Sequence, residues 1–149
     1  RSRPQELAIL KVADIDLEAR TMFGGLKTDA GRNRIVPIHS AIYELVVANY
    51  NKAVAMGSDY LFNDENGQQG THLTYDKYRG RFEKINKRFN MSHKPHDTRH
   101  TFISAAKSAN MNEYILKLIV GHEILDVTEK VYTHRSMQEL ADEIEKIVY

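Results

Sequence analysis

The segment KPHDTRHTFISAAKSANMNEYILKLIVGH, residues 94–122, predicts two consecutive helices and so indicates the fold class of the chain. Pro95 interrupts the preceding pattern, and residues 96–109 resume at helical spacing. The apolar positions of that helix are Phe102, Ile103 and Ala106. Two asparagines, in the stretch SANMN, then favour a break before the apolar residues 113–121. Two amphipathic helices joined by a short turn are typical of a largely α-helical domain.

A small β-hairpin is predicted nearer the start of the chain. Strand candidates at residues 17–26 and 32–38 bracket KTDAG, whose Asp and Gly favour a turn. Further helical patterns cover residues 3–16, 41–56, 71–89, 127–134 and 137–149. We therefore expect a mainly α domain with a small antiparallel β-hairpin or sheet, which places the chain in the α+β class.

Two details of these helices are specific enough to be checked. Ser40 is expected to cap the helix at residues 41–56. The helix at residues 71–89 carries an aromatic and aliphatic stripe, which we expect to face the core while its basic residues face solvent. The stripe consists of Leu73, Tyr78, Phe82, Ile85 and Phe89.

Length and composition exclude several classes of protein. With 149 residues, 42% of them hydrophobic, the chain suits one domain with its own core. It has no cysteine, which excludes a disulfide framework, a thiolate zinc site and a cysteine nucleophile, and which fits a reducing cytoplasm. There is no signal-peptide pattern and no run of about 18 or more apolar residues, so neither secretion nor membrane insertion is indicated.

Charge is distributed unevenly, although the net charge is only +1. Residues 79–99 contain seven Lys or Arg against two acids, whereas residues 136–149 contain four acids and one Lys. Local positive charge suits a polyphosphate partner, because binding releases condensed counterions. A solvated helix face would have the same composition, and it is the more common meaning of such a run.

The stretch HDTRH offers both a metal site and a phosphate site. His96 and His100 are four apart, as in some zinc sites. Further histidine ligands could come from His93, His122 and His134. Arg99 lies one turn after His96, however, and a guanidinium is unfavourable beside a dication but well suited to a phosphate. On these residues alone, metal binding, phosphate binding and a structural role for the histidines all stay open.

Five motifs in order resemble the catalytic domain of tyrosine recombinases, particularly integrases of temperate phages and conjugative transposons. They are RPQEL (residues 3–7), KTDAGRNRIVPI (27–38), HDTRHTF (96–102), VGH (120–122) and VYTH (131–134). The resemblance spans nearly the whole chain. It implies DNA strand exchange through a covalent 3′-phosphotyrosine, with no metal and no nucleotide cofactor.

The resemblance also implies a role for particular residues. The catalytic set would be Arg3, Lys27, His96, Arg99, His122 and Tyr132. Glu6 matches the acidic residue of the first motif, and we expect it to support the site by pairing with an arginine or histidine. His134, two residues after the tyrosine, is expected to support the site structurally or by a hydrogen bond. His100 is then left with packing or support of the fold.

The chemistry of phosphodiester cleavage fits these residue types. Arg3 and Arg99 would stabilise the negative charge that develops on the nonbridging oxygens, and His122 would add a hydrogen bond to one of them. Tyrosine has a reference pKa near 10, so only about one in a thousand is ionised at pH 7. His96 is therefore a plausible general base. From the resemblance, Lys27 would protonate the leaving oxygen.

The resemblance further implies how the domain is organised and assembled. We expect residues 1–149 to be a catalytic domain that is truncated at its start and lacks a core-binding domain. Its partner would be double-stranded DNA, on which it would act as a homo-tetramer. The protein would be encoded by a bacterium or a phage and would act on DNA in the cytoplasm. The fragment itself could be monomeric, and residues 136–149 would be a segment passed between neighbours. A type IB topoisomerase, a non-catalytic DNA-binding module and, more remotely, a metal-dependent hydrolase are the alternatives.

Overall fold

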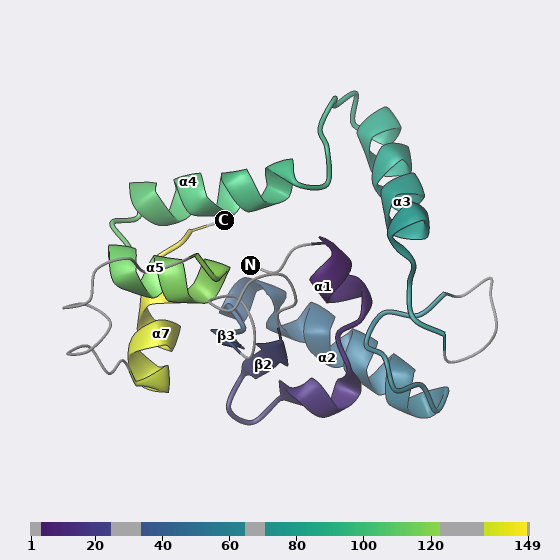
Figure 1. The fold of residues 1–149 in the computed structure, drawn as a ribbon, viewed down its shortest axis with the longest axis horizontal. Helices are drawn as coiled ribbons and strands as arrows, with labels where there is room; N and C mark the ends of the chain where they lie inside the picture. Colours follow the sequence, from purple (N-terminus) through teal and green to yellow (C-terminus); the bar gives the residue numbers. More distant parts are fainter. Residues whose placement is uncertain (1–3, 25–33, 65–70, 123–135, 149) are drawn as a thin grey trace.

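The computed structural model describes residues 4–24, 34–64, 71–122 and 136–148 (Figure 1). Its elements in chain order are α1 (Pro4–Ala8), η1 (Val12–Asp14), β1 (Ile15–Asp16), β2 (Thr21–Gly24), β3 (Arg34–Pro37), α2 (Ser40–Ala55), α3 (Tyr75–Arg88), α4 (Asp97–Ser108), α5 (Glu113–Val120) and α7 (Met137–Ile144). The predicted fold class, mainly helical with a small antiparallel sheet, is confirmed. The hairpin turn KTDAG and the helix predicted at residues 127–134 lie outside the described residues.

The sheet has three strands in the order β1-β2-β3, all antiparallel. In β3 the side chains alternate, so that Val36 is buried opposite Met22 while Ile35, one residue earlier, is exposed. Strand β1 adds Ile15 opposite Met22 on the other edge of β2. The single helix predicted at residues 3–16 is therefore wrong beyond Ala8, because its second half turns through η1 into a strand.

Helices α4, α5 and α7 close a hydrophobic core on one side of β3. The turn at residues 108–112 ends α4 and begins α5, where the Asn112 side chain caps the new helix by accepting from the N–H groups of Tyr114 and Ile115. Both helices predicted from residues 94–122 are thus confirmed. A second cluster, formed by Leu10, Ile15, Ile38 and Leu61, lies between the sheet and α2.

Two predicted details of the helices differ from the structure. Helix α2 begins at Ser40 itself, and its cap is His39, whose Nδ1 accepts the Ala41 N–H at 2.9 Å. The predicted core stripe is confirmed only at its start: Leu73 is 5% exposed, but α3 itself has no buried residue and Phe89 is 63% exposed. The reason is tertiary, because α3 lies at the periphery away from the core built by α4, α5 and α7 (Figure 1).

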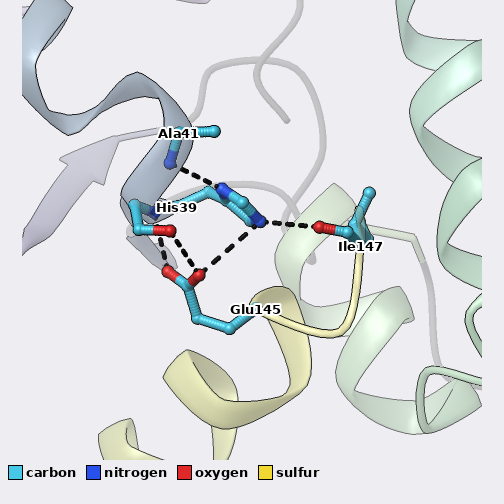
Figure 2. A network of polar contacts seen from close by, with 5 residues as sticks. His39, Ala41, Glu145 and Ile147 are labelled. Carbon is cyan, nitrogen blue, oxygen red and sulfur yellow. Dashed lines mark hydrogen bonds and ion pairs between the residues drawn. The ribbon is translucent and has the colours of Figure 1, made fainter. Parts of the chain in front are cut away.

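The end of α7 is fastened to the start of α2 in the same chain (Figure 2). His39 Nε2 lies 2.9 Å from the Ile147 carbonyl oxygen and 3.6 Å from a Glu145 carboxylate oxygen. The backbone N–H and hydroxyl of Ser40 donate to that carboxylate at 2.7 and 2.6 Å. Segment 136–148 therefore docks on its own chain here, and its exchange between neighbours remains a prediction. No helix in the described ranges is both long and apolar enough to cross a membrane.

Candidate active site at the end of helix α5

Two buried arginines meet at the C-terminal end of α5. Arg34, the first residue of β3, donates from Nε to the Ile119 carbonyl oxygen at 3.1 Å. Arg99 of α4 donates from Nη2 to the next carbonyl oxygen, that of Val120. The two arginines are only 8% and 4% exposed. The last carbonyls of a helix lack partners within it and carry partial negative charge, so they favour cations at this end.

A left-handed residue ends α5 and positions His122 at this centre. Gly121 has φ 68°, a conformation that costs side chains with a Cβ more than it costs glycine. The turn lets the backbone N–H of His122 reach back to the Lys117 carbonyl at 3.0 Å. His122 therefore follows directly after the carbonyls that the two arginines bind, and it is exposed to solvent.

The start of α4 places His96 and Arg99 on adjacent turns. Asp97 Oδ2 accepts the Lys94 N–H at 2.8 Å, and the Arg99 N–H donates to the His96 carbonyl at 3.0 Å. The guanidinium side chain points into the protein, whereas His96 is exposed. His100 is also exposed, and it contacts the His96 ring edge-on at 5.1 Å between centroids. Packing of His100 into the core is therefore not observed, and its contact is with His96.

Helix α1 joins the centre through an ion pair that is almost fully buried. Glu6 Oε2 accepts a hydrogen bond from Arg34 Nη2 at 2.8 Å, and the two side chains are 4% and 7% exposed. The expected pairing of Glu6 with an arginine is confirmed, although the sequence analysis did not identify Arg34 as that partner. One signal was available: alternation along β3 puts Arg34 on the same face as the buried Val36.

The described part of the site thus consists of Glu6, Arg34, Arg99 and His122, with His96 one turn from Arg99 at the surface. Arg3, Lys27, Tyr132 and His134 lie outside the described residues, and their roles remain predictions. Among the described residues, no three His, Asp or Glu side chains are grouped so that they could hold a metal ion. Arg34 and Arg99 hold their guanidiniums at fixed positions beside the end of α5, and guanidiniums are the side chains best suited to binding a phosphate anion.

A second basic feature, α3, is solvated. Its Lys and Arg residues are Lys77, Arg79, Arg81, Lys84, Lys87 and Arg88, and none is buried. Lys77 binds the buried carboxylate of Asp64. Arg79 makes only long ion pairs, at 3.7 Å to Asp76 and 3.8 Å to Glu83. Exposure of the helix agrees both with a phosphate-binding surface and with an ordinary solvated face.

An apolar cavity of about 440 Å³ between α2 and the sheet is less suited to this chemistry. Side chains such as Leu10, Val46 and Phe102 line it, together with His39. Among the described residues that line it there is no arginine or lysine to bind an anionic substrate. The charged centre at the end of α5 is therefore the better candidate for a functional site.

Comparison with known proteins agrees with the sequence motifs. The tyrosine recombinase XerA of Saccharolobus solfataricus is 29% identical over 141 residues, which are 95% of this chain and 44% of that protein. The tyrosine recombinase XerA of Pyrococcus horikoshii is 26% identical over 146 residues, covering 97% of this chain and 50% of the relative. The chain therefore spans about half the length of these relatives.

Solved structures show the same fold. The match to the integrase of mycobacterium phage Brujita covers 99% of this chain and 47% of the integrase, with a TM-score of 0.73 at 23% identity. An integrase of the Tn1549 transposon, solved in complex with circular intermediate DNA, matches 97% of the chain with a TM-score of 0.67 at 25% identity, over 53% of its own length. The model of the phage integrase family matches residues 2–139. The chain belongs to the phage integrase family.

Proposed function

We propose that this chain is the catalytic domain of a site-specific DNA recombinase of the tyrosine type. The observation that supports this most is the buried Arg99 beside the end of α5, with His122 after the same turn and His96 one helical turn away. The hydrogen bond to the Val120 carbonyl holds the positive charge of Arg99 in a fixed geometry at this end of α5. Such a centre favours the added negative charge of a phosphodiester under attack.

The proposed reaction forms a bond between the Tyr132 phenolic oxygen and the scissile phosphorus, and breaks the bond from phosphorus to the 5′-oxygen. His96 accepts the phenolic proton, and Lys27 donates a proton to the departing 5′-oxygen. Arg3 and Arg99 bind the nonbridging oxygens, to which His122 adds a hydrogen bond. Because the 3′-phosphotyrosine keeps the energy of the broken bond, religation to another strand needs no ATP.

The proposed substrate is double-stranded DNA at recombination sites, bound by a homo-tetramer of this protein. The protein would be encoded by a bacterium or a phage and would act in the cytoplasm. The exposed cations of α3 support a contact with the phosphate backbone, where each would release counterions. The DNA complex of the Tn1549 integrase belongs to that relative, and it supports the choice of DNA as partner for this chain. The product would be an integrated or excised mobile element.

Strand exchange is the test that separates this function from that of a topoisomerase. Full-length protein is incubated with two differently labelled duplexes that carry its site, and with supercoiled DNA, both in EDTA. A recombinase produces recombinant duplexes joining both labels. Relaxation without recombinant product would support the topoisomerase-like alternative, and loss of all reaction in EDTA would contradict both.

A further inference from the structure

Arg34 lies where three of the sequence motifs converge. Its guanidinium binds Glu6, which follows Arg3 by three residues in the first motif. It also binds the Ile119 carbonyl, three residues before His122. Arg34 itself stands in the motif that contains Lys27. One buried side chain therefore joins the segments that contribute three of the proposed catalytic residues.

Helix α4, which carries Arg99, binds the end of α5 next to the contact that Arg34 makes there. Arg99 binds the Val120 carbonyl, next along the chain from the carbonyl that Arg34 binds. A shift of the last turn of α5 would therefore move the partners of both arginines together. Arg34 already uses Nε and Nη2 for Ile119 and Glu6, the two contacts that join these segments.

The contacts need a guanidinium and not merely a positive charge. Arg34 donates from Nη2 to Glu6 and from Nε to the Ile119 carbonyl. Because both nitrogens belong to one rigid, planar guanidinium, the angle between the two hydrogen bonds is fixed. A lysine has a single Nζ and no rigid fork, so it would keep the charge while losing the angle between the two contacts. Removing one member of a buried pair also leaves the other charge without its partner.

We infer that Arg34 is a positioning residue of the catalytic centre: it fixes α1 and the end of α5 relative to each other and so orients Arg99 and His122 toward the scissile phosphate. The inference rests on the proposed function of the centre. Arg34 acts through its neighbours, and we assign it no contact with the reacting atoms.

The first test measures covalent protein–DNA adduct formation by the full-length protein on a nicked suicide substrate. Arg34→Lys should slow adduct formation by about 10²-fold, the scale of an error of about 1 Å in catalytic geometry. DNA affinity should stay within about twofold, because the surface cations are unchanged. Glu6→Gln, which keeps the shape of the side chain, should slow the reaction in the same direction and serves if Arg34→Lys folds poorly.

A matched control separates positioning from loss of stability. Leu61→Ala removes buried volume from the second cluster, where Leu61 is packed with Leu10, Ile15 and Ile38. It should lower the melting temperature yet leave the adduct rate unchanged when assayed well below that temperature. If the Arg34 and Glu6 variants instead lose rate only in proportion to their unfolded fraction, as Leu61→Ala would, the positioning role is overturned.

A second readout would not respond to a merely structural role. In a methylphosphonate substrate one charged nonbridging oxygen is replaced by a methyl group, so part of the arginine clamp has nothing to bind. Arg34→Lys should then slow the phosphodiester more than the methylphosphonate, lowering the ratio of their rates by about 10-fold. An unchanged ratio would contradict the inference. If the wild-type protein forms no adduct on either substrate, the proposed function fails, whereas an active wild type matched by Arg34→Lys overturns the positioning role alone.

Discussion

Helices α3 and α4 follow each other in the chain, and both combine basic residues with an apolar stripe, yet the fold uses them differently. Helix α3 buries none of its residues, whereas α4 buries Arg99, Phe102 and Ala106. Apart from Lys77, which pairs with the buried Asp64, the cations of α3 lie in solvent, where salt screens them. Arg99 is held at a fixed position in a medium of lower polarity, so its charge is screened less and acts in a fixed direction. We therefore expect the arginines of α3 to contribute to DNA affinity and Arg99 to contribute to the chemical step.

Aromatic residues give the largest expected contrast between the two helices. Phe102 in α4 is 5% exposed, and Phe102→Ala should lower the free energy of unfolding by about 3–5 kcal/mol. Phe89, directly after α3, is 63% exposed, and Phe89→Ala should change it by no more than about 0.5 kcal/mol. Chemical denaturation of both variants measures the difference. Equal losses would mean that α3 is packed in a way the structure does not show.

Arginine substitutions extend the contrast to catalysis. Arg99→Lys should slow covalent adduct formation by roughly 10²- to 10³-fold, because lysine keeps the charge but loses the planar fork that orients it. Arg79→Lys on α3 is the matched control, since Arg79 is exposed and makes only long ion pairs, and it should leave the rate within about twofold. Comparable rates for the two variants would remove Arg99 from the catalytic centre.

The exposed cations of α3 should affect binding without affecting chemistry. If Arg81, Lys84 and Lys87 contact phosphates, the triple change to Gln should make the dependence of log K on log salt shallower by up to about 2.7 units. The rate of adduct formation at saturating DNA should not change. A salt dependence equal to that of the wild type would mean that α3 is only a solvated face.

The smallest expected effect concerns the contact of Glu145, at the end of α7, with Ser40 at the start of α2. Helices α7 and α4 contribute to the same hydrophobic core. Burial raises the pKa of Glu145, but the hydrogen bonds from Ser40 and the electrostatic effects of His39 and Arg20 outweigh burial, so the net pKa is below its ordinary 4.5. The carboxylate therefore contributes stability above pH 4.5, and that contribution is lost as pH falls through the lowered folded-state pKa.

Glu145→Gln tests this contribution. At pH 7 the substitution should cost less than about 1 kcal/mol of unfolding free energy, because the side chain is partly exposed and its ion pair is screened. The difference from wild type should shrink as the pH is lowered below 4.5 in thermal melts. A difference that persists unchanged at low pH would show that the charge of Glu145 does not fasten α7.

The parts of the fold that could be predicted from the sequence are those with a local signal. The paired helices α4 and α5 have clear periodicity with an asparagine cap between them, and the two longer strands flank turn residues. The errors arise where tertiary contacts decide the outcome. The stripe on α3 has the periodicity of a core helix, but no residue of α3 belongs to either of the two buried clusters of the described residues. His39 caps α2 while also binding Ile147, 108 residues away.

The residues of the candidate site likewise divide into those with a local sequence signal and those placed by tertiary contacts. His96 and Arg99 stand out because their spacing is that of one helical turn, and His122 because of its place in the VGH motif. Alternation along β3 is the one local signal for Arg34, and it indicates burial only. Its partners Glu6 and Ile119 are 28 and 85 residues away in sequence, so they become visible only when the sheet, α1 and α5 are placed together. Sequence patterns thus identify candidate reacting groups more readily than the residues that position them.

The account depends most on Tyr132 as nucleophile at a metal-independent centre, and covalent trapping tests both parts together. Full-length protein and its Tyr132→Phe variant are incubated with a nicked suicide substrate in EDTA, and the linked peptide is identified by mass spectrometry. We predict a 3′-phosphotyrosine adduct at Tyr132 for the wild type and none for the variant. An adduct on Tyr132→Phe, a linkage to another residue, or a requirement for a divalent metal would contradict the account.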